Sequence, residues 1–186
     1  MARRWGSSAS CKDGLELMRP GEAKRQEKER PVPCSSILIL GVGNILLSDE
    51  GVGVRVIEAM REMKLPNNVE LLDGGTASLD LLESLANRDK VIVVDAVIAG
   101  NEVGTLYRFT PGDITIQGQN PVSVHEIGLL ETLTIAGYLG CAPREVIIYG
   151  IEPKETGLGL ELSSEVAGIV PKVVELVLGE VGSKHT

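Results

Sequence analysis

Three side chains in this sequence could bind a metal ion or transfer a proton, namely Glu50, Asp95 and His125. Glu50 follows an apolar strand predicted at residues 37–41, and Asp95 ends a second apolar strand predicted at 90–95. His125 comes at the start of a predicted helix. In open α/β proteins, ligands bind beyond the carboxyl ends of the parallel strands. We therefore expect the three side chains to lie at one edge of a sheet.

Two carboxylates and one imidazole suit two kinds of chemistry. They can bind a borderline divalent ion such as zinc or nickel and leave positions for water or substrate. They also suit acid–base hydrolysis, in which one carboxylate orients the imidazole and the other polarises water. Each residue has an ordinary structural interpretation as well: Glu50 in a helix dipole, Asp95 in a loop cap and His125 on a helix surface. The spacing does not choose between these possibilities.

The turn after the first strand, GVGNILLSDEG, resembles a nucleotide-binding loop but lacks its third glycine, because Leu46 stands there. Asp49 and Glu50 would also repel a pyrophosphate. We therefore expect the turn to present carboxylates, with Asn44 as a further polar candidate. For Asp49 itself we predict a solvated position at the helix N-terminus.

A second polar turn follows the strand predicted at residues 69–72. Its four residues are Asp73, Gly74, Gly75 and Thr76. A glycine pair is often only a tight turn. It also lets another polypeptide backbone approach closely, because no Cβ atom intervenes.

Predicted strands and helices alternate from Ser36 onward, which is typical of a mostly parallel sheet. Further strands are expected at 104–109, antiparallel or at the sheet edge, and at 145–149. Helices are expected at 50–63, 78–86, 123–138 and from 163 or 164 to 178, the last kinked or split at Pro171. We predict one three-layer α/β domain over residues 36–181, with a twisted, mostly parallel sheet of about five strands and helices on both faces.

The composition excludes several classes of function. Residues 1–34 carry eight Lys/Arg and five Asp/Glu, whereas the remainder carries ten and twenty-one, a net charge of −11 that disfavours nucleic acid as a partner. Three scattered cysteines support neither a disulfide framework nor a thiolate zinc site. The sequence contains no run of eighteen apolar residues, so it predicts no membrane span. We therefore expect a soluble, cytoplasmic protein. Residues 1–35 are predicted to be a disordered extension and 182–186 a flexible tail.

Several motifs occur in order over residues 37–180: GVGNILLSDEGVGVRV, LLDGGTASLDLL, VIVVDAVIAG with GTLYRF, VHEIGL and YGIEP. This series resembles the [NiFe]-hydrogenase maturation endopeptidases. The resemblance implies a cytoplasmic peptidase that removes the C-terminal extension of the hydrogenase large-subunit precursor after nickel insertion. Glu50, Asp95 and His125 would be the catalytic, metal-binding residues, with nickel supplied by the substrate rather than held permanently. The turn 73–76 would contact the substrate.

Other functions remain open at this point. A metallohydrolase of similar fold would hold its own zinc, and a nickel metallochaperone would deliver the metal without cutting. The missing third glycine argues against a nucleotide-binding module, and the absence of a His-rich tract or Cys pair argues against the chaperone. For the peptidase, the catalytic step could use a metal-polarised carbonyl or water, or a carboxylate as general base.

Overall fold

The structure is a computed structural model that describes residues 36–76, 79–114 and 124–182, with only the backbone described at 79 and 124–127. The extension predicted at 1–35, most of the predicted tail and the predicted helix caps Ser78 and Ser123 lie outside the described residues. The strands are β1 (Ile37–Val42), β2 (Val69–Gly75), β3 (Lys90–Ala96), β4 (Leu106–Phe109) and β5 (Glu145–Ile151). The α-helices are α1 (Val52–Arg61), α2 (Leu82–Leu85), α3 (Val124–Tyr138) and α4 (Ser164–Gly182), and 3-10 turns occur at η1 (Ser48–Gly51), η2 (Leu79–Leu81) and η3 (Pro111–Asp113).

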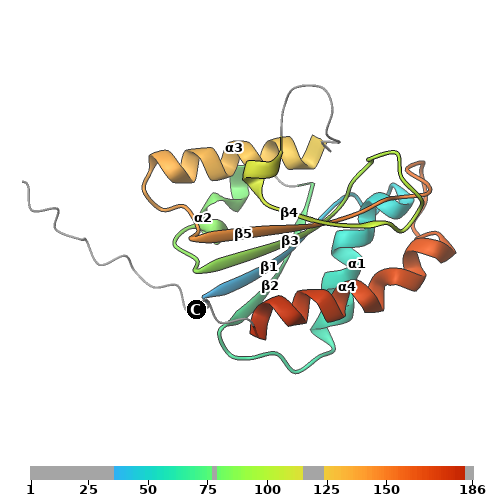
Figure 1. Ribbon diagram of the computed structural model, residues 1–186, viewed down its shortest axis with the longest axis horizontal. Coiled ribbons are helices and arrows are strands. Elements are labelled where there is room, and N and C mark those ends of the chain that lie inside the picture. Colours follow the sequence, from blue (N-terminus) through green and yellow to red (C-terminus); the bar gives the residue numbers. More distant parts are fainter. Residues whose placement is uncertain (1–35, 77–78, 115–123, 183–186) are drawn as a thin grey trace, which may run out of the picture.

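The five strands form one sheet in the order β2-β1-β3-β5-β4 (Figure 1). The first four are mutually parallel, and β4 runs antiparallel to β5 at the edge. Residue Ile37 of β1 pairs with Val69 on one side and Lys90 on the other, so the strands start in register. The predicted mostly parallel sheet with an antiparallel edge strand is therefore confirmed.

Helices cover both faces of this sheet, α1 and α4 on one side and α2 and α3 on the other (Figure 1). Successive side chains of each buried strand point to opposite faces of the sheet, so alternate residues pack in the two different cores. In β1, Ile37 and Ile39 belong to the core beneath α1 and α4, whereas Leu38 and Leu40 belong to the core beneath α2 and α3. The three-layer prediction is thus confirmed. Helix α1 turns four fully buried side chains to its core: Val52, Val56, Ile57 and Met60.

Three helices differ from their predictions. The helix expected at 78–86 is the 3-10 turn η2 followed by the short helix α2. The α-helix expected from residue 50 begins only at Val52, since residues 48–51 form the 3-10 turn η1. The last helix was expected to end near residue 178, with a kink or a split at Pro171. It continues through Pro171 to Gly182, so of these two alternatives the split is wrong. A proline removes one amide hydrogen bond, but buried valines on both sides of it, Val166 and Val173, hold both halves of α4 on the same core.

The first turn of α1 packs directly on the ends of two strands. A Cβ atom on Gly53 would lie 2.2 Å from the carbonyl oxygen of Val94 in β3 and 2.3 Å from that of Val42 in β1. The chain leaves β1 towards β2 on one side and later adds β3 on the other. This reversal of strand order makes the carboxyl ends of β1 and β3 a topological switch point, the place where open α/β sheets bind ligands. Of the helices in the described part of the chain, none has the length and apolar character needed to cross a membrane.

Candidate functional site

Two of the three predicted site residues lie at this switch point, near the carboxyl ends of β1 and β3. Glu50 belongs to η1, which contacts β3, and its side chain is partly exposed. Its carbonyl oxygen lies so close to Gly43 that a Cβ atom there would overlap it. Asp95 is the penultimate residue of β3 and is only 1% exposed. The structure therefore brings Glu50 and Asp95 to the same sheet edge.

Asp95 is a buried carboxylate at the end of an apolar strand. One of its oxygens, Oδ1, accepts a hydrogen bond of 2.8 Å from the backbone N–H of Ala96. Burying a carboxylate costs several kcal/mol unless hydrogen bonds or a cation stabilise it. A group of this kind at a ligand-binding edge is suited to binding a cation.

His125 is the second residue of α3, and its side chain lies outside the described residues. Helix α3 packs against α2 and η2, with Leu129 buried on the sheet. Among the side chains that the structure describes, no group of three or more His, Cys, Asp and Glu gathers as a metal site. The three-residue site with His125 therefore stays a prediction.

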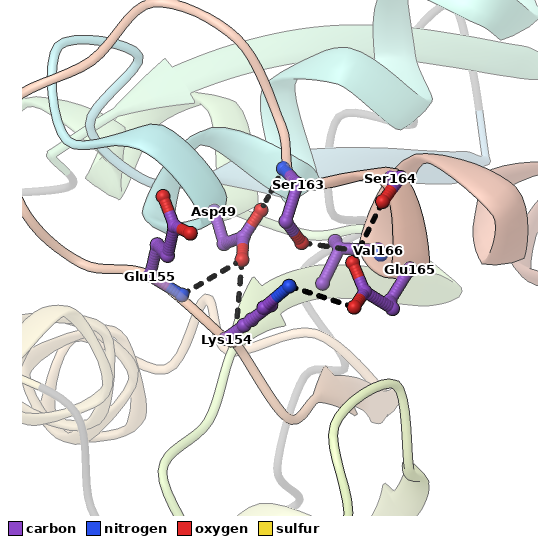
Figure 2. Close-up of polar contacts among 7 residues, drawn as sticks. All are labelled: Asp49, Lys154, Glu155, Ser163, Ser164, Glu165 and Val166. Carbon is purple, nitrogen blue, oxygen red and sulfur yellow. Dashed lines mark hydrogen bonds and ion pairs between the residues drawn. The ribbon is translucent and has the colours of Figure 1, made fainter.

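Asp49 is where the sequence prediction was wrong, because this carboxylate is fully buried rather than solvated. Its Oδ2 accepts hydrogen bonds from the backbone N–H groups of Lys154 and Glu155, each at 2.9 Å. Its Oδ1 accepts another at 2.7 Å from the N–H of Ser163 (Figure 2). The three amides come from the segment between β5 and α4, more than a hundred residues along the chain. Asp49 thus fastens that segment to the turn that carries Glu50.

The turn at 73–76 lies beside the end of β1. Gly41 pairs with Asp73 and Val42 with Gly75, so Gly74 is an inserted residue that bends the strand. The Asp73 carboxylate accepts the Gly75 N–H at 2.9 Å, and Gly75 adopts a left-handed φ of 51°. Among the described residues, none has an atom within 4 Å of a Cβ atom placed on Gly75. One side of this backbone is therefore not covered by the described part of the chain.

Asn44, the other polar candidate, shapes its own turn. Its Oδ1 accepts the Leu46 N–H at 3.0 Å, and its carbonyl oxygen accepts the Leu47 N–H at 3.0 Å. A side-chain bond to the amide two residues on is typical of asparagine turns. Asn44 therefore fixes the loop that connects β1 to η1.

Glu152 is a structural residue of the site that the sequence analysis did not single out. It follows β5, is 4% exposed, and accepts hydrogen bonds from Ala99 N–H (2.9 Å), Gly100 N–H (3.0 Å) and the Tyr107 hydroxyl (2.5 Å). Burial raises the pKa of Glu152, but the bonds from Tyr107 and the backbone outweigh this and hold the pKa below its usual value. Glu152 thereby fixes the loop that follows Asp95. Its only signal in the sequence is a carboxylate placed directly after an apolar strand.

Several solved structures similar to this one are hydrogenase maturation peptidases. The hydrogenase maturating endopeptidase HybD from Escherichia coli is 36% identical, with a TM-score of 0.70 over 78% of this chain and 91% of that one. The hydrogenase 2 maturation peptidase of Thaumarchaeota archaeon SCGC_AB-539-E09 is 33% identical, with a TM-score of 0.63 over 81% of this chain and 100% of that one.

Sequence comparison gives the same class. The family described as hydrogenase maturation protease matches residues 54–180. The hydrogenase 2 maturation protease of Escherichia coli (strain K12) is 38% identical over 144 residues, which are 76% of this chain and 88% of that protein. The chain belongs to the hydrogenase maturation protease family, and the predicted family, fold and enzyme class are confirmed.

Proposed function

We propose that this chain is a cytoplasmic endopeptidase that removes the C-terminal extension of a [NiFe]-hydrogenase large-subunit precursor after nickel has been inserted. The observation that carries the proposal is the pair of carboxylates at the carboxyl ends of β1 and β3. Asp95 is buried and Glu50 is partly exposed, in a chain whose relatives are hydrogenase maturation proteases. The cytoplasmic location follows from the family that the sequence resembles.

Nickel in this proposal is part of the substrate. Carboxylate oxygens and a neutral imidazole are suitable ligands for a borderline divalent ion. Glu50 and Asp95 would bind the nickel that the precursor already holds, and His125 would supply the nitrogen. A precursor without nickel would lack this contact and bind more weakly. Cleavage would then report that metal insertion is complete.

The site also has the groups that peptide hydrolysis needs. A water oxygen adds to the carbonyl carbon, the C–N bond breaks, and one proton passes from the water to the departing amine. Glu50 is accessible to water because its side chain is partly exposed. A carboxylate at that place can accept the proton, and the substrate's metal can polarise either the carbonyl or the water.

The open side of Gly75 supports a role in holding the substrate. Its carbonyl oxygen accepts the Gly43 N–H at 2.7 Å, so the turn is tied to the loop that leads to Glu50. The absence of a Cβ atom lets a bound polypeptide approach this backbone. We assign the turn 73–76 to substrate contact.

Substitution of the three proposed ligands tests this function. The precursor is incubated with the wild-type protein and with Glu50→Ala, Asp95→Ala or His125→Ala, and the product masses are measured. We expect one C-terminal truncation with the wild type and none with the variants, whose circular dichroism spectra should match the wild type. A folded His125→Ala variant that still cleaves would remove histidine from the mechanism. Stoichiometric zinc in the purified protein without cleavage would favour the metallohydrolase instead, and bound nickel without cleavage the metallochaperone.

A further inference from the structure

Four large apolar side chains stand exposed beside the candidate site. Two come from the loop after β1, Ile45 (41% exposed) and Leu46 (55%), and two from the segment before α4, Leu158 (91%) and Leu160 (61%). We call these four residues the apolar rim. The rim combines segments that are more than a hundred residues apart in the sequence.

Backbone hydrogen bonds join the two halves of the rim. The Gly159 N–H donates to the Leu46 carbonyl at 3.0 Å, and the Ser48 N–H donates to the Gly159 carbonyl at 2.9 Å. Leu47 and Gly159 form a short parallel β-bridge. The exposed leucines Leu158 and Leu160 therefore flank a residue that is paired with the loop of the site.

Side chains hold this arrangement in place as well. The buried Asp49 carboxylate binds three amides of the same segment. The Ser48 hydroxyl donates to the Gly157 carbonyl at 3.1 Å, and the Arg55 guanidinium donates to the Leu160 carbonyl at 2.6 Å. A loop with this many anchors presents its leucines in one arrangement. Exposed apolar side chains held together in this way are a feature of binding surfaces, because burying them on a partner is favourable.

The rim adjoins the proposed catalytic carboxylate. A Cβ atom on Gly51 would lie 3.0 Å from the Cα of Ile45, and Gly51 directly follows Glu50. An endopeptidase cuts within a chain, so its substrate extends to both sides of the bond that is broken. If the substrate bond lies next to the Glu50 carboxylate when it is broken, the substrate segment on one side of that bond would cross the rim.

Charges around the rim narrow the chemistry of its partner. Glu155 and Glu161 are exposed acidic neighbours. The nearby cations are already paired, Arg55 with Glu58 at 3.0 Å and Lys154 with Glu165 at 2.7 Å. The surface therefore complements a segment that carries positive charge next to its apolar side chains.

A shallow hollow of about 300 Å³ opens next to Leu160. It is lined by Arg55, Glu161, Leu162, Ala167 and Val170. Three aliphatic side chains lined up with one acidic and one basic side chain suit a side chain of an extended peptide that is partly apolar. The hollow adjoins the rim, because its lining residues Glu161 and Leu162 directly follow Leu160.

We propose that the apolar rim is the docking surface for an apolar, Lys- or Arg-flanked segment of the precursor polypeptide, next to the bond that is cut. This inference rests on the proposed function, since it assumes that the precursor is cleaved beside the Glu50 carboxylate of this protein.

The double variant Leu158→Asn/Leu160→Asn tests the docking surface. Its matched control is Leu139→Asn, which changes a leucine of similar exposure (65%) beyond the end of α3. Leu139 lies at the other end of the strands, near their amino ends. The carbonyl oxygen of nearby Cys141 accepts the N–H of Asn87, which precedes β3. Steady-state cleavage of nickel-loaded precursor should show a roughly tenfold higher KM for the double variant, equivalent to about 1.4 kcal/mol of binding. The kcat of the double variant and both constants of the control should stay at wild-type values.

Each other outcome has a definite meaning. Wild-type cleavage with an unchanged KM in the double variant would overturn the docking surface and leave the proposed function intact. Absence of cleavage by the wild-type protein would overturn both. Sedimentation would detect a different occupant, because a wild-type dimer that the double variant dissociates would make the rim a contact between two copies of this chain and overturn the proposal.

Discussion

The buried Asp49 carboxylate gives the sharpest stability prediction. Asp49→Asn keeps the size and shape of the side chain but leaves one oxygen for three amides. The N–H groups of Lys154 and Glu155 share Oδ2 and that of Ser163 bonds Oδ1. At least one amide therefore loses its acceptor and faces an NH2 group, and the remaining bonds lose their charge. Hydrogen bonds to a charged group contribute about 1.5–3 kcal/mol each, so we expect Asp49→Asn to lower the free energy of unfolding by about 3 kcal/mol.

Denaturant and thermal unfolding followed by circular dichroism would measure this loss. For a domain of this size each kcal/mol corresponds to roughly 2–4 °C, so the midpoint should fall by roughly 6–12 °C. Glu50→Gln is the matched control, since it removes the same charge at the next residue, on a partly exposed side chain. It should change stability by about 0.5 kcal/mol or less. Equal stabilities of the two variants would refute the reasoning that Asp49 fastens the segment before α4.

Three further predictions concern other parts of the domain. Gly53→Ala places a methyl group against two strand carbonyls and should destabilise the protein by about 3 kcal/mol. Gly168→Ala should not destabilise it, because a Cβ atom there meets no atom of the described residues within 4 Å. Equal unfolding midpoints of the two variants would contradict this close packing at Gly53. Because the pKa of Glu152 is lowered in the folded protein, its stabilisation is complete above the usual value of 4.5 and is lost as the pH falls through the lowered value. Unfolding titrations at several pH values should therefore show a smaller acid-induced loss in Glu152→Gln, and an unchanged pH dependence would count against it. Gly75→Asn should keep the fold, because asparagine tolerates the left-handed φ of 51°, but should slow precursor cleavage; parallel loss of stability and cleavage would indicate a purely structural turn.

The sequence predicted the fold well because its strands are local apolar runs. The run VIVV at residues 91–94 is continuously apolar and rich in β-branched side chains, which is typical of a strand covered on both faces. The residues at the strand ends followed from the same reasoning, since parallel strands place their carboxyl ends at one edge. Glu50 and Asp95 were expected at that edge for this reason.

What the sequence could not predict depends on contacts between distant segments. Nothing near Asp49 indicates that amides at 154, 155 and 163 will surround it, so a helix N-terminal carboxylate was the natural interpretation. Glu152 was missed for the same reason, because its partners Ala99, Gly100 and Tyr107 are about fifty residues away. The helix through Pro171 was also decided by tertiary packing. Local preference for a break there was outweighed by buried valines on either side of the proline.

The most direct test of the central claim is mass spectrometry of the cognate large-subunit precursor after incubation with this protein. The precursor is used in nickel-loaded and nickel-free forms, and Glu50→Gln replaces the wild-type protein in a parallel reaction. Our account predicts a single C-terminal truncation that requires both nickel in the precursor and the Glu50 carboxylate. Equal cleavage of the nickel-free precursor would contradict recognition of the substrate's metal, and no cleavage of the nickel-loaded precursor would contradict the peptidase itself.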